Sequence, residues 1–410
     1  MAANPSIQLG TDGNWAIKED NLLAYKKDGD RFFNKEFDFS RGSTATYVGR
    51  DGLIASAASG VPRIDFTNDT KGHLLLEPQS TNLVPYSEDF SQSEWFKLSS
   101  TVTPNTGTSP DGSQNAHNLH FDGTPNARLQ VRIPTVNTKI YTFSIWIKKI
   151  SANYTSNNKA RIEGFNSGTV GILLLGDALN NAAVGEFIRY SVTTTASTGG
   201  TSFFQFRSDE EATFEVWGAQ LEEGSLTSYI PTTGAASTRN ADVCNNSGSA
   251  QDFNDSEGVL FAEIAALAND GTGRKITLNN GSNSNVLVLE YTSTSNQIRV
   301  FLSNGVLQFN EYITLSDLRL NTKFAIKYKV NDFALWVNGF ELASDNIGTT
   351  FSDGTLSKIN FDDGSGFADF YGKTKAVAVF KEALTDSELE TLTSYTSFTD
   401  MANELNLTIK

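Results

Sequence analysis

The sequence predicts an all-β protein with two antiparallel β-sandwich domains of jelly-roll type, which follow a short mixed N-terminal segment. Short runs of alternating Val, Ile, Phe, Thr and Tyr are interrupted every several residues by Gly, Asn, Asp and Ser, a spacing typical of sandwiches rather than βαβ units. Helical patterns are almost absent, with one short exception near the C-terminus. The chain has 410 residues, of which 39% are hydrophobic, so it can form more than one core.

The clearest strand is YTFSIWIKK (141–149). Side chains alternate between the two faces of a strand, so we expect one face to point into a core. That apolar face consists of Tyr141, Phe143, Ile145 and Ile147. The opposite face is polar apart from one tryptophan and consists of Thr142, Ser144, Trp146 and Lys148.

Two local sequence patterns predict structure in the C-terminal part of the chain. Asn338-Gly339 separates two strand-like runs, and this dipeptide accepts positive φ at both positions, so it predicts a tight type I′ hairpin. In ALTDSELETL (383–392), Thr385 and Glu388 have the spacing of a capping box, which predicts the single short helix. Leu384 and Leu389 have the spacing of the accompanying hydrophobic staple.

Turn-rich stretches divide the chain into four parts. We expect an N-terminal segment at 1–75, a first sandwich at 76–240, a second sandwich at 241–395 and a tail at 396–410. The net charge is −15, and residues 241–410 contribute 12 Lys and Arg against 22 Asp and Glu, or −10. The second sandwich is therefore expected to be the most solvent-exposed part or to bind a cation.

The composition argues against several partners. An acidic chain repels phosphate backbones, so we expect no nucleic-acid binding. No apolar run approaches the ~18 residues of a membrane span, and we expect no membrane insertion. The first residues lack the basic and apolar parts of a signal peptide. The one cysteine, Cys244, cannot form an intrachain disulfide.

Catalytic patterns are missing, and the sequence predicts a protein that is not an enzyme. There is no G-x-S-x-G elbow and no phosphate-binding loop. His117 and His120 are three residues apart on a predicted strand, so they point to opposite faces and are interpreted as surface residues. Two carboxylate pairs are interpreted as solvated turn charge rather than a glycosidase pair: Glu210-Glu211 and Glu222-Glu223.

An aromatic residue among polar neighbours is the first candidate binding site. Sugars stack their C–H faces on aromatic rings, while polar side chains bind their hydroxyls. Trp146 could be such a platform, with Lys148 beside it on the polar face, or it could cover a second core. Trp217 is the other candidate carbohydrate-binding residue, with core packing as its alternative.

A cluster of carboxylates on a glycine-rich loop is the second candidate. Asp362, Asp363 and Asp369 lie in DDGSGFAD (362–369), and hard oxygen ligands on a flexible loop suit Ca²⁺. The hypothesis is a structural calcium ion, and the alternative is a set of ordinary turns. No other cofactor is expected.

Three stretches together resemble virion proteins of tailed bacteriophages, namely fibres, spikes, and receptor-binding or decoration proteins. They are RGSTATYVGRDGLIASAASGVPRIDF (41–66), LLLEPQSTNLVPYSEDFSQSEW (74–95) and EVWGAQLEEGSLTSYIPTTGAASTR (215–239). The resemblance implies that 76–240 is similar to a carbohydrate-binding module. It also implies a concanavalin-A/laminin-G-like sandwich at 241–395. Such modules often hold a calcium ion, and Asp89 matches the first acidic position, whereas Ser91 and Trp217 stand at the others.

The same resemblance implies a non-catalytic structural role on the virion, made in the host cytoplasm without a signal peptide. The N-terminal segment would dock to phage head or tail proteins, the chain would form a homotrimer, and the sandwiches would attach to host or environmental glycans. Three alternatives remain: a bacterial surface or secreted glycan-binding lectin, a glycan depolymerase, and a purely structural protein that binds nothing.

Overall fold

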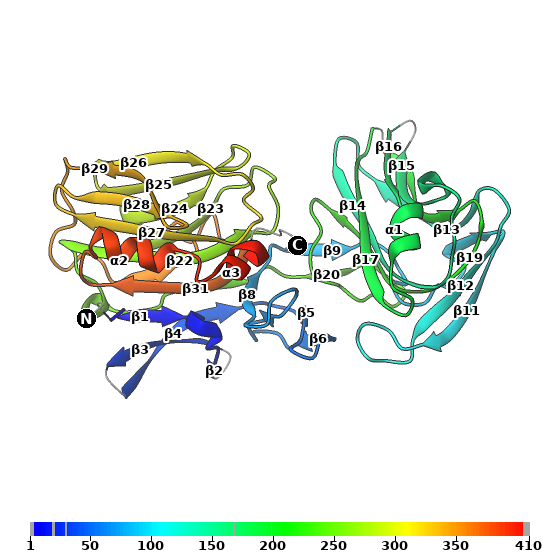
Figure 1. Ribbon diagram of the computed structural model, residues 1–410, viewed down its shortest axis with the longest axis horizontal. Helices are drawn as coiled ribbons and strands as arrows, with labels where there is room; N and C mark the ends of the chain where they lie inside the picture. The colour runs from blue at the N-terminus through cyan, green and yellow to red at the C-terminus, as the bar shows by residue number, and fades with distance from the viewer. Residues whose placement is uncertain (1–3, 19–20, 29–30, 167–168, 198, 405–410) are drawn as a thin grey trace. The chain divides into compact units, whose positions relative to one another are not determined.

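The computed structural model describes residues 4–18, 21–28, 31–166, 169–197 and 199–404, and it confirms the all-β class (Figure 1). The chain forms two compact units. Unit 1 comprises Met1–Gly42, Ala57–Pro78 and Ala241–Lys410, and unit 2 comprises Ser43–Ser56 and Gln79–Asn240. Within the described ranges, no helix is long and apolar enough to cross a membrane.

Unit 1 is a sandwich of two antiparallel sheets. The larger sheet has the order β21-β4-β3-β1-β31-β22-β27-β28-β29, and β2, β7 and β8 pair beside this path. Its strands are β1 (Ile7–Leu9), β2 (Ile17–Lys18), β3 (Asn21–Asp28), β4 (Arg31–Ser40), β7 (Ile64–Asp65), β8 (His73–Leu76), β21 (Val243–Asn245), β22 (Glu257–Ala266), β27 (Thr322–Lys329), β28 (Phe333–Val337), β29 (Phe340–Asp345) and β31 (Gly372–Phe380). The smaller sheet has the order β26-β25-β24-β23-β30, with β23 (Arg274–Asn279), β24 (Asn285–Tyr291), β25 (Gln297–Asn304), β26 (Leu307–Thr314) and β30 (Lys358–Asn360).

Strand β22 is buried on both of its faces. Leu260, Ala262 and Ile264 point into the main core between the two sheets. Val259 and Phe261 belong to a smaller core on the other side of the sheet, which is covered by helix α2 (Asp386–Thr393; Figure 1). The remaining helical elements of unit 1 are η1 (Thr11–Gly13), η3 (Ala250–Asp252) and α3 (Phe398–Glu404).

Unit 2 is the second sandwich. Its two sheets have the orders β10-β13-β18-β15-β16 and β11-β12-β19-β14-β17, and two ribbons, β20-β9 and β5-β6, complete it. The strands are β5 (Ala45–Val48), β6 (Ile54–Ala57), β9 (Ser80–Asn82), β10 (Trp95–Leu98), β11 (Ser100–Gly107), β12 (Ala116–Asp122), β13 (Ala127–Thr135), β14 (Ile140–Ser151), β15 (Ala160–Asn166), β16 (Thr169–Leu174), β17 (Phe187–Thr195), β18 (Gly200–Ser208), β19 (Glu211–Glu223) and β20 (Ser237–Arg239). The short helices are η2 (Asn157–Lys159) and α1 (Gly176–Asn181).

The local sequence signals are confirmed. The predicted inner face of β14, formed by Tyr141, Phe143, Ile145 and Ile147, lies in the core of unit 2. Asn338 and Gly339 have φ of 49° and 87° and connect β28 to β29. Both hydrogen bonds of the capping box at Thr385 are present, and Leu384 and Leu389 are buried together. Helices α1 and α3 were not predicted, because neither carries a capping pattern as clear as that of α2.

The predicted N-terminal segment 1–75 is grouped differently in the structure. Its first strands complete the large sheet of unit 1, because β1 pairs with β31 and β3 pairs with β4. Residues 43–56 form the β5-β6 ribbon and belong to unit 2. The predicted tail 396–410 includes helix α3, and residues 405–410 lie outside the described residues. The docking role of the N-terminal segment 1–75 stays a prediction.

A buried network of four charged side chains organises unit 1. Arg63 donates to Glu77 Oε2 at 2.7 Å and to Asp242 Oδ2 at 2.5 Å. Arg41 donates to Asp242 Oδ1 at 3.0 Å and also to the carbonyl oxygens of Ala58 and Val61. Burial opposes the charge on Arg63, but the two carboxylates raise its pKa above its usual value. The buried Arg63 therefore stays charged because the two carboxylates lie beside it.

Replacing Asp242 with alanine should strongly destabilise unit 1. The substitution leaves Arg41 and Arg63 buried beside a single carboxylate, and removal of one partner from such a network costs roughly 3–5 kcal/mol. Chemical denaturation monitored by circular dichroism measures the effect. The matched control is Arg319→Ala, since that arginine is 63% exposed and its pair with Asp317 should contribute little. Equal stability of the Asp242→Ala variant and the wild type would contradict the importance of the network.

Candidate functional site

Trp146 lies on the outer face of β14, as predicted, but its ring is already packed. The guanidinium of Arg189 lies over the ring, 4.2 Å from its centroid. The rings of Trp217 and Tyr229 meet it edge to face, with centroid distances of 5.3 and 5.4 Å. Trp146 therefore belongs to a small aromatic cluster on the outer side of the sheet.

The cluster is held in place by the segment that follows β19. Arg189 donates from Nη1 to the carbonyl oxygen of Thr227 at 2.7 Å, and the Tyr229 hydroxyl lies 2.7 Å from Ser87 Oγ. Gly218 has φ of 63°, and a Cβ at this position would lie only 2.8 Å from Trp146 Cε3. The glycine thus admits both the bulge in β19 and the tryptophan ring that packs against it.

The predicted carbohydrate-binding residues do not form a sugar platform. Trp217 is only 1% exposed, so its prediction as a binding residue is corrected: its ring packs 4.5 Å from that of Tyr229. Lys148 is ion-paired with Glu215 and lies over Phe187, with its ammonium 4.9 Å from the ring centroid. The outer face of β14 is covered because a segment distant in sequence lies on it.

The predicted calcium site at the glycine-rich loop is also corrected. Asp362 is 2% exposed and accepts hydrogen bonds from Asn245, Asn360 and the Gly364 amide. Asp363 accepts from Ser365 and the Phe367 amide, and Asp369 accepts from the Tyr371 hydroxyl. Across the part of the chain that the structure describes, no group of three or more His, Cys, Asp or Glu side chains could hold a metal ion. These carboxylates stabilise turns.

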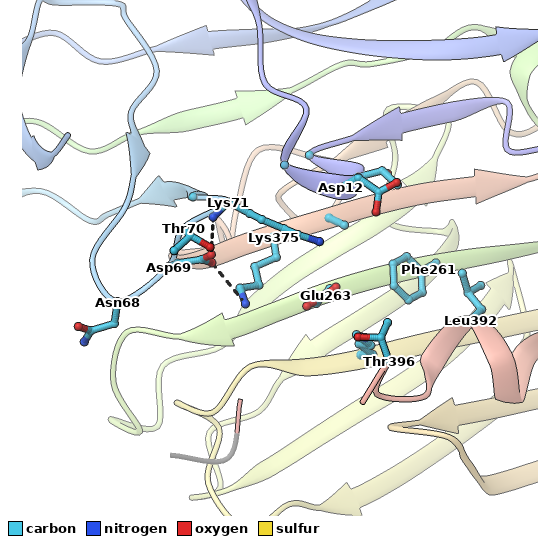
Figure 2. Close-up of a pocket in the computed structure, with 16 residues that line it drawn as sticks. Asp12, Asn68, Asp69, Thr70, Lys71, Phe261, Glu263, Lys375, Leu392 and Thr396 are labelled. Atoms are coloured by element: carbon cyan, nitrogen blue, oxygen red, sulfur yellow. Dashed lines mark hydrogen bonds and ion pairs between the residues drawn. The ribbon is translucent and has the colours of Figure 1, made fainter. Parts of the chain in front are cut away.

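A cavity of about 680 Å³ lies on the outer side of the large sheet of unit 1 (Figure 2). Its floor is formed by β22 and β31, which contribute Phe261, Glu263, Lys375 and Ala376. Two loops form the walls, at residues 10–13 and 68–72, and the end of the α2 region closes it with Leu392 and Thr396.

The wall formed by residues 10–13 depends on a glycine. Gly10 has φ of 68°, and a Cβ there would lie 2.4 Å from both the Lys375 carbonyl oxygen and the Trp15 ring. The loop can therefore approach β31 only because this position has no side chain. This close approach brings Thr11 and Asp12 to the pocket.

Hydrogen-bonding groups dominate the pocket. Ten of its 16 lining residues are polar or charged: Thr11, Asp12, Asn68, Asp69, Thr70, Lys71, Glu263, Lys323, Lys375 and Thr396. Asp69 forms an ion pair with Lys375, with an N···O distance of 3.3 Å, and accepts from the Lys71 amide at 2.9 Å (Figure 2). The three lysines balance the three carboxylates, so the pocket offers donors and acceptors without a net charge.

His73 lies behind this wall and is only 2% exposed. Its ring nitrogens are 3.6 Å from Asp65 and 3.9 Å from Asp69. Burial is the main effect on its pKa, Lys373 acts in the same direction, and the pKa falls from 6.5 to about 4 despite the two carboxylates. His117, which was predicted at the surface, is likewise buried at 3% exposed, because it packs edge to face against Phe90.

The sequence signal for this pocket was weak. Its residues come from six separate stretches, and the contributions from residues 10–13 and 68–72 are ordinary turn sequences rich in Gly, Asn, Asp and Thr. Only the pairing of β1 and β8 with β31 brings these turns beside the floor. No spacing within a single stretch could have indicated the site.

Comparisons with known proteins do not establish a family. No protein-family model matches the chain, and no curated protein matches it. Among solved structures, the CBM40 module of the Ruminococcus gnavus IT-sialidase is 16% identical, with a TM-score of 0.31, over 37% of this chain and 94% of that one. The CBM22 tandem of Paenibacillus barcinonensis Xyn10C is 10% identical, with a TM-score of 0.28, over 79% and 94%. Domains LG4-5 of mouse laminin alpha1 are 9% identical, with a TM-score of 0.24, over 75% and 93%. TM-scores this low carry no argument about function.

Replacing Trp146 with alanine should destabilise unit 2. The ring contacts three large side chains, and removal of a partly buried tryptophan should cost about 2 kcal/mol, below the range for a fully buried one. Thermal unfolding measures the loss. The control is Phe96→Ala, an aromatic residue of the same unit that is 39% exposed. A Trp146→Ala variant as stable as the control variant would show that the cluster is not a packing element.

His73 should make stability depend on pH. Well above pH 6.5 the residue is neutral in both the folded and the unfolded chain, and its contribution is constant. As the pH falls from 6.5 toward 4, the unfolded chain takes up a proton that the folded chain does not, so the free energy of unfolding decreases. Urea titrations at pH 7, 6 and 5 measure the slope, which His73→Gln should reduce. An unchanged slope in the variant would contradict this assignment.

Proposed function

We propose that this chain is a non-catalytic glycan-binding protein carried on the virion of a tailed bacteriophage. The observation that carries the binding part is the open, charge-balanced pocket of about 680 Å³ on unit 1. Its volume lies within the range of roughly 300–1,000 Å³ that small-molecule sites occupy. One or two sugar rings would fit into this space.

The lining of the pocket suits a sugar better than a simple ion. Each sugar hydroxyl both donates and accepts, so a ring is best bound where donors and acceptors alternate. Lys71 and Lys375 supply donors, while Asp69 and Glu263 supply acceptors. Phe261 lies on the floor among them, but it is only 6% exposed because it packs in the core under helix α2, so recognition rests on the polar groups.

The virion part of the proposal is supported by the three sequence stretches that resemble phage fibre and decoration proteins. Under this proposal the N-terminal residues dock to head or tail proteins, and the chain assembles as a homotrimer. Three copies of a weak site would then act together, because linked sites bind at high effective concentration. Attachment would be to glycans of the host or its environment.

Immunogold electron microscopy tests the location. An antibody against the purified chain should label a fixed position on intact phage particles produced by lysis. Labelling of the bacterial surface in uninfected cultures, with no label on particles, would contradict the proposal and favour a bacterial lectin.

Substitution of the exposed Lys71 tests the pocket. Lys71→Ala should weaken binding to glycans extracted from the host surface about tenfold, because a hydrogen bond from a charged donor is lost. Lys358→Ala is the control, since this lysine lies on β30 of the same unit and outside the pocket. Biolayer interferometry on immobilised glycan measures both affinities. Equal loss in the two variants, or none in either, would remove the pocket from the proposal.

A further inference from the structure

The outer face of the sheet β10-β13-β18-β15-β16 in unit 2 carries four arginines among the described residues. Arg128 and Arg132 lie on β13, Arg207 lies opposite Arg128 on β18, and Arg161 lies opposite Arg207 on β15. Residues directly opposite each other on paired strands point to the same face, and so do residues an even number apart on one strand. Leu129 alternates with these arginines on β13 and lies in the core of unit 2, so the arginines point outward.

Two of the four arginines have carboxylate partners. Arg161 pairs with Glu163 and Asp209, with N···O distances of 3.2 and 3.3 Å. Arg207 pairs with the same two carboxylates, at 3.9 Å from Glu163 and 3.0 Å from Asp209. Two carboxylates therefore compensate two arginines, and this part of the face has no excess charge.

The other two arginines, Arg128 and Arg132, form no ion pair within the described ranges. Arg128 donates from Nε to Gln130 Oε1 at 3.2 Å and from Nη1 to the Asn126 carbonyl oxygen at 3.3 Å, and both acceptors are neutral. The chain as a whole has 47 acidic against 32 basic side chains, so two uncompensated arginines on one face are unusual for it. A positive patch of this kind complements a negatively charged ligand.

A phenylalanine ring holds the two guanidiniums beside each other. Phe96 lies on β10 opposite Gln130, which stands between the two arginines on β13. The centroid of the Phe96 ring is 5.5 Å from the guanidinium carbon of Arg128 and 5.8 Å from that of Arg132. Arg132 also lies 5.2 Å from the centroid of the Phe203 ring. Contact with a ring uses the face of a guanidinium, so the N–H groups in its plane stay available to a ligand.

A ligand can reach this part of the face. Arg132 is exposed and Arg128 is half-buried. Phe96 is 39% exposed, and Leu98, which lies opposite Arg128 on the edge strand β10, is 37% exposed. An accessible apolar strip therefore runs beside the two uncompensated charges.

We propose that this part of unit 2 binds an acidic glycan, whose carboxylates accept hydrogen bonds from Arg128 and Arg132. A guanidinium presents paired N–H donors that match the two oxygens of a carboxylate. In a uronic acid the carboxylate is attached directly to the sugar ring, so C–H groups of the ring can contact Phe96 and Leu98 while the carboxylate meets an arginine. The site lies on unit 2 and does not depend on the function proposed for the pocket on unit 1.

The arrangement favours a glycan over an acidic peptide. Aspartate and glutamate carry their carboxylates on flexible side chains, which lose conformational entropy when they are ordered on binding. A sugar ring holds its carboxylate rigidly, so less entropy is lost. An acidic polysaccharide also repeats its carboxylates along an extended chain, and Arg128 and Arg132 likewise repeat along β13.

Isothermal titration of the full chain at neutral pH and low salt tests the proposal with three probes: trigalacturonic acid, its methyl ester and N-acetyl-triglutamate. Trigalacturonic acid should bind at least tenfold more tightly than the ester, which lacks the charges, and than the peptide, which lacks the rings. Equal binding of the ester or of the peptide, or no binding of trigalacturonic acid, overturns the proposal.

Substitutions locate the site. Arg132→Gln should weaken the binding of trigalacturonic acid about tenfold, because a charged donor is lost. Phe96→Ala should weaken it roughly fivefold, because both arginines lose their contact with the ring. The matched control is Arg319→Gln, which removes the same charge from an arginine of unit 1 that is 63% exposed and already paired with Asp317.

Loss in Arg132→Gln with retention in Arg319→Gln supports the site, and circular dichroism checks that both variants keep the fold. Unchanged binding in Arg132→Gln, or an equal loss in Arg319→Gln, overturns the proposal. Lys71→Ala should bind trigalacturonic acid normally, since Lys71 lines the pocket on unit 1. Loss in Lys71→Ala alone would place the acidic glycan in that pocket, which would overturn this inference while supporting the proposed function.

Discussion

Unit 1 depends on the buried charges of Arg41, Arg63, Glu77 and Asp242. Unit 1 is assembled from three separate stretches of chain, and the chain leaves or re-enters it after Gly42, before Ala57, after Pro78 and before Ala241. Arg41 directly precedes Gly42, Glu77 directly precedes Pro78, and Asp242 directly follows Ala241. Arg63 lies after the crossing at Ala57. The ion pairs of this network therefore connect the three stretches of unit 1 near their ends.

This arrangement gives a physical reason for the sequence motifs. RGSTATYVGR begins with Arg41, the stretch ending in VPRIDF contains Arg63, and LLLEP contains Glu77. Buried charges tolerate few replacements, because each one needs its partners in position. Arg41, Arg63 and Glu77 of the first two stretches thus hold unit 1 together, whereas the third stretch, 215–239, lies in unit 2.

The fold was predictable where a signal was local. Alternation in β14, the Asn338-Gly339 turn and the capping box at Thr385 each involve neighbours in sequence, and each is confirmed. The site was not predictable in this way. Trp146 looked exposed because its strand neighbours are polar, but Arg189 and Tyr229 cover it from distant parts of the chain. Glu222 was interpreted as solvated, yet it is fully buried and accepts from Ser80 and Thr227.

The pocket of unit 1 could not be predicted from local sequence patterns either. Residues of turns, such as Asp69, carry no motif, and strand pairing alone brings Asp69 beside Lys375. In the pocket of unit 1, turns that are distant in sequence form walls over a floor made by β22 and β31. Such a site needs no reactive side chain, since arranged donors and acceptors are sufficient for recognition.

A crystal structure of the full chain grown with an oligosaccharide from the host surface tests the central claim most directly. We predict an intact oligosaccharide in the pocket of unit 1, hydrogen-bonded to the lysines and carboxylates around it. A cleaved product, or a sugar bound only on the face around Trp146, would contradict it.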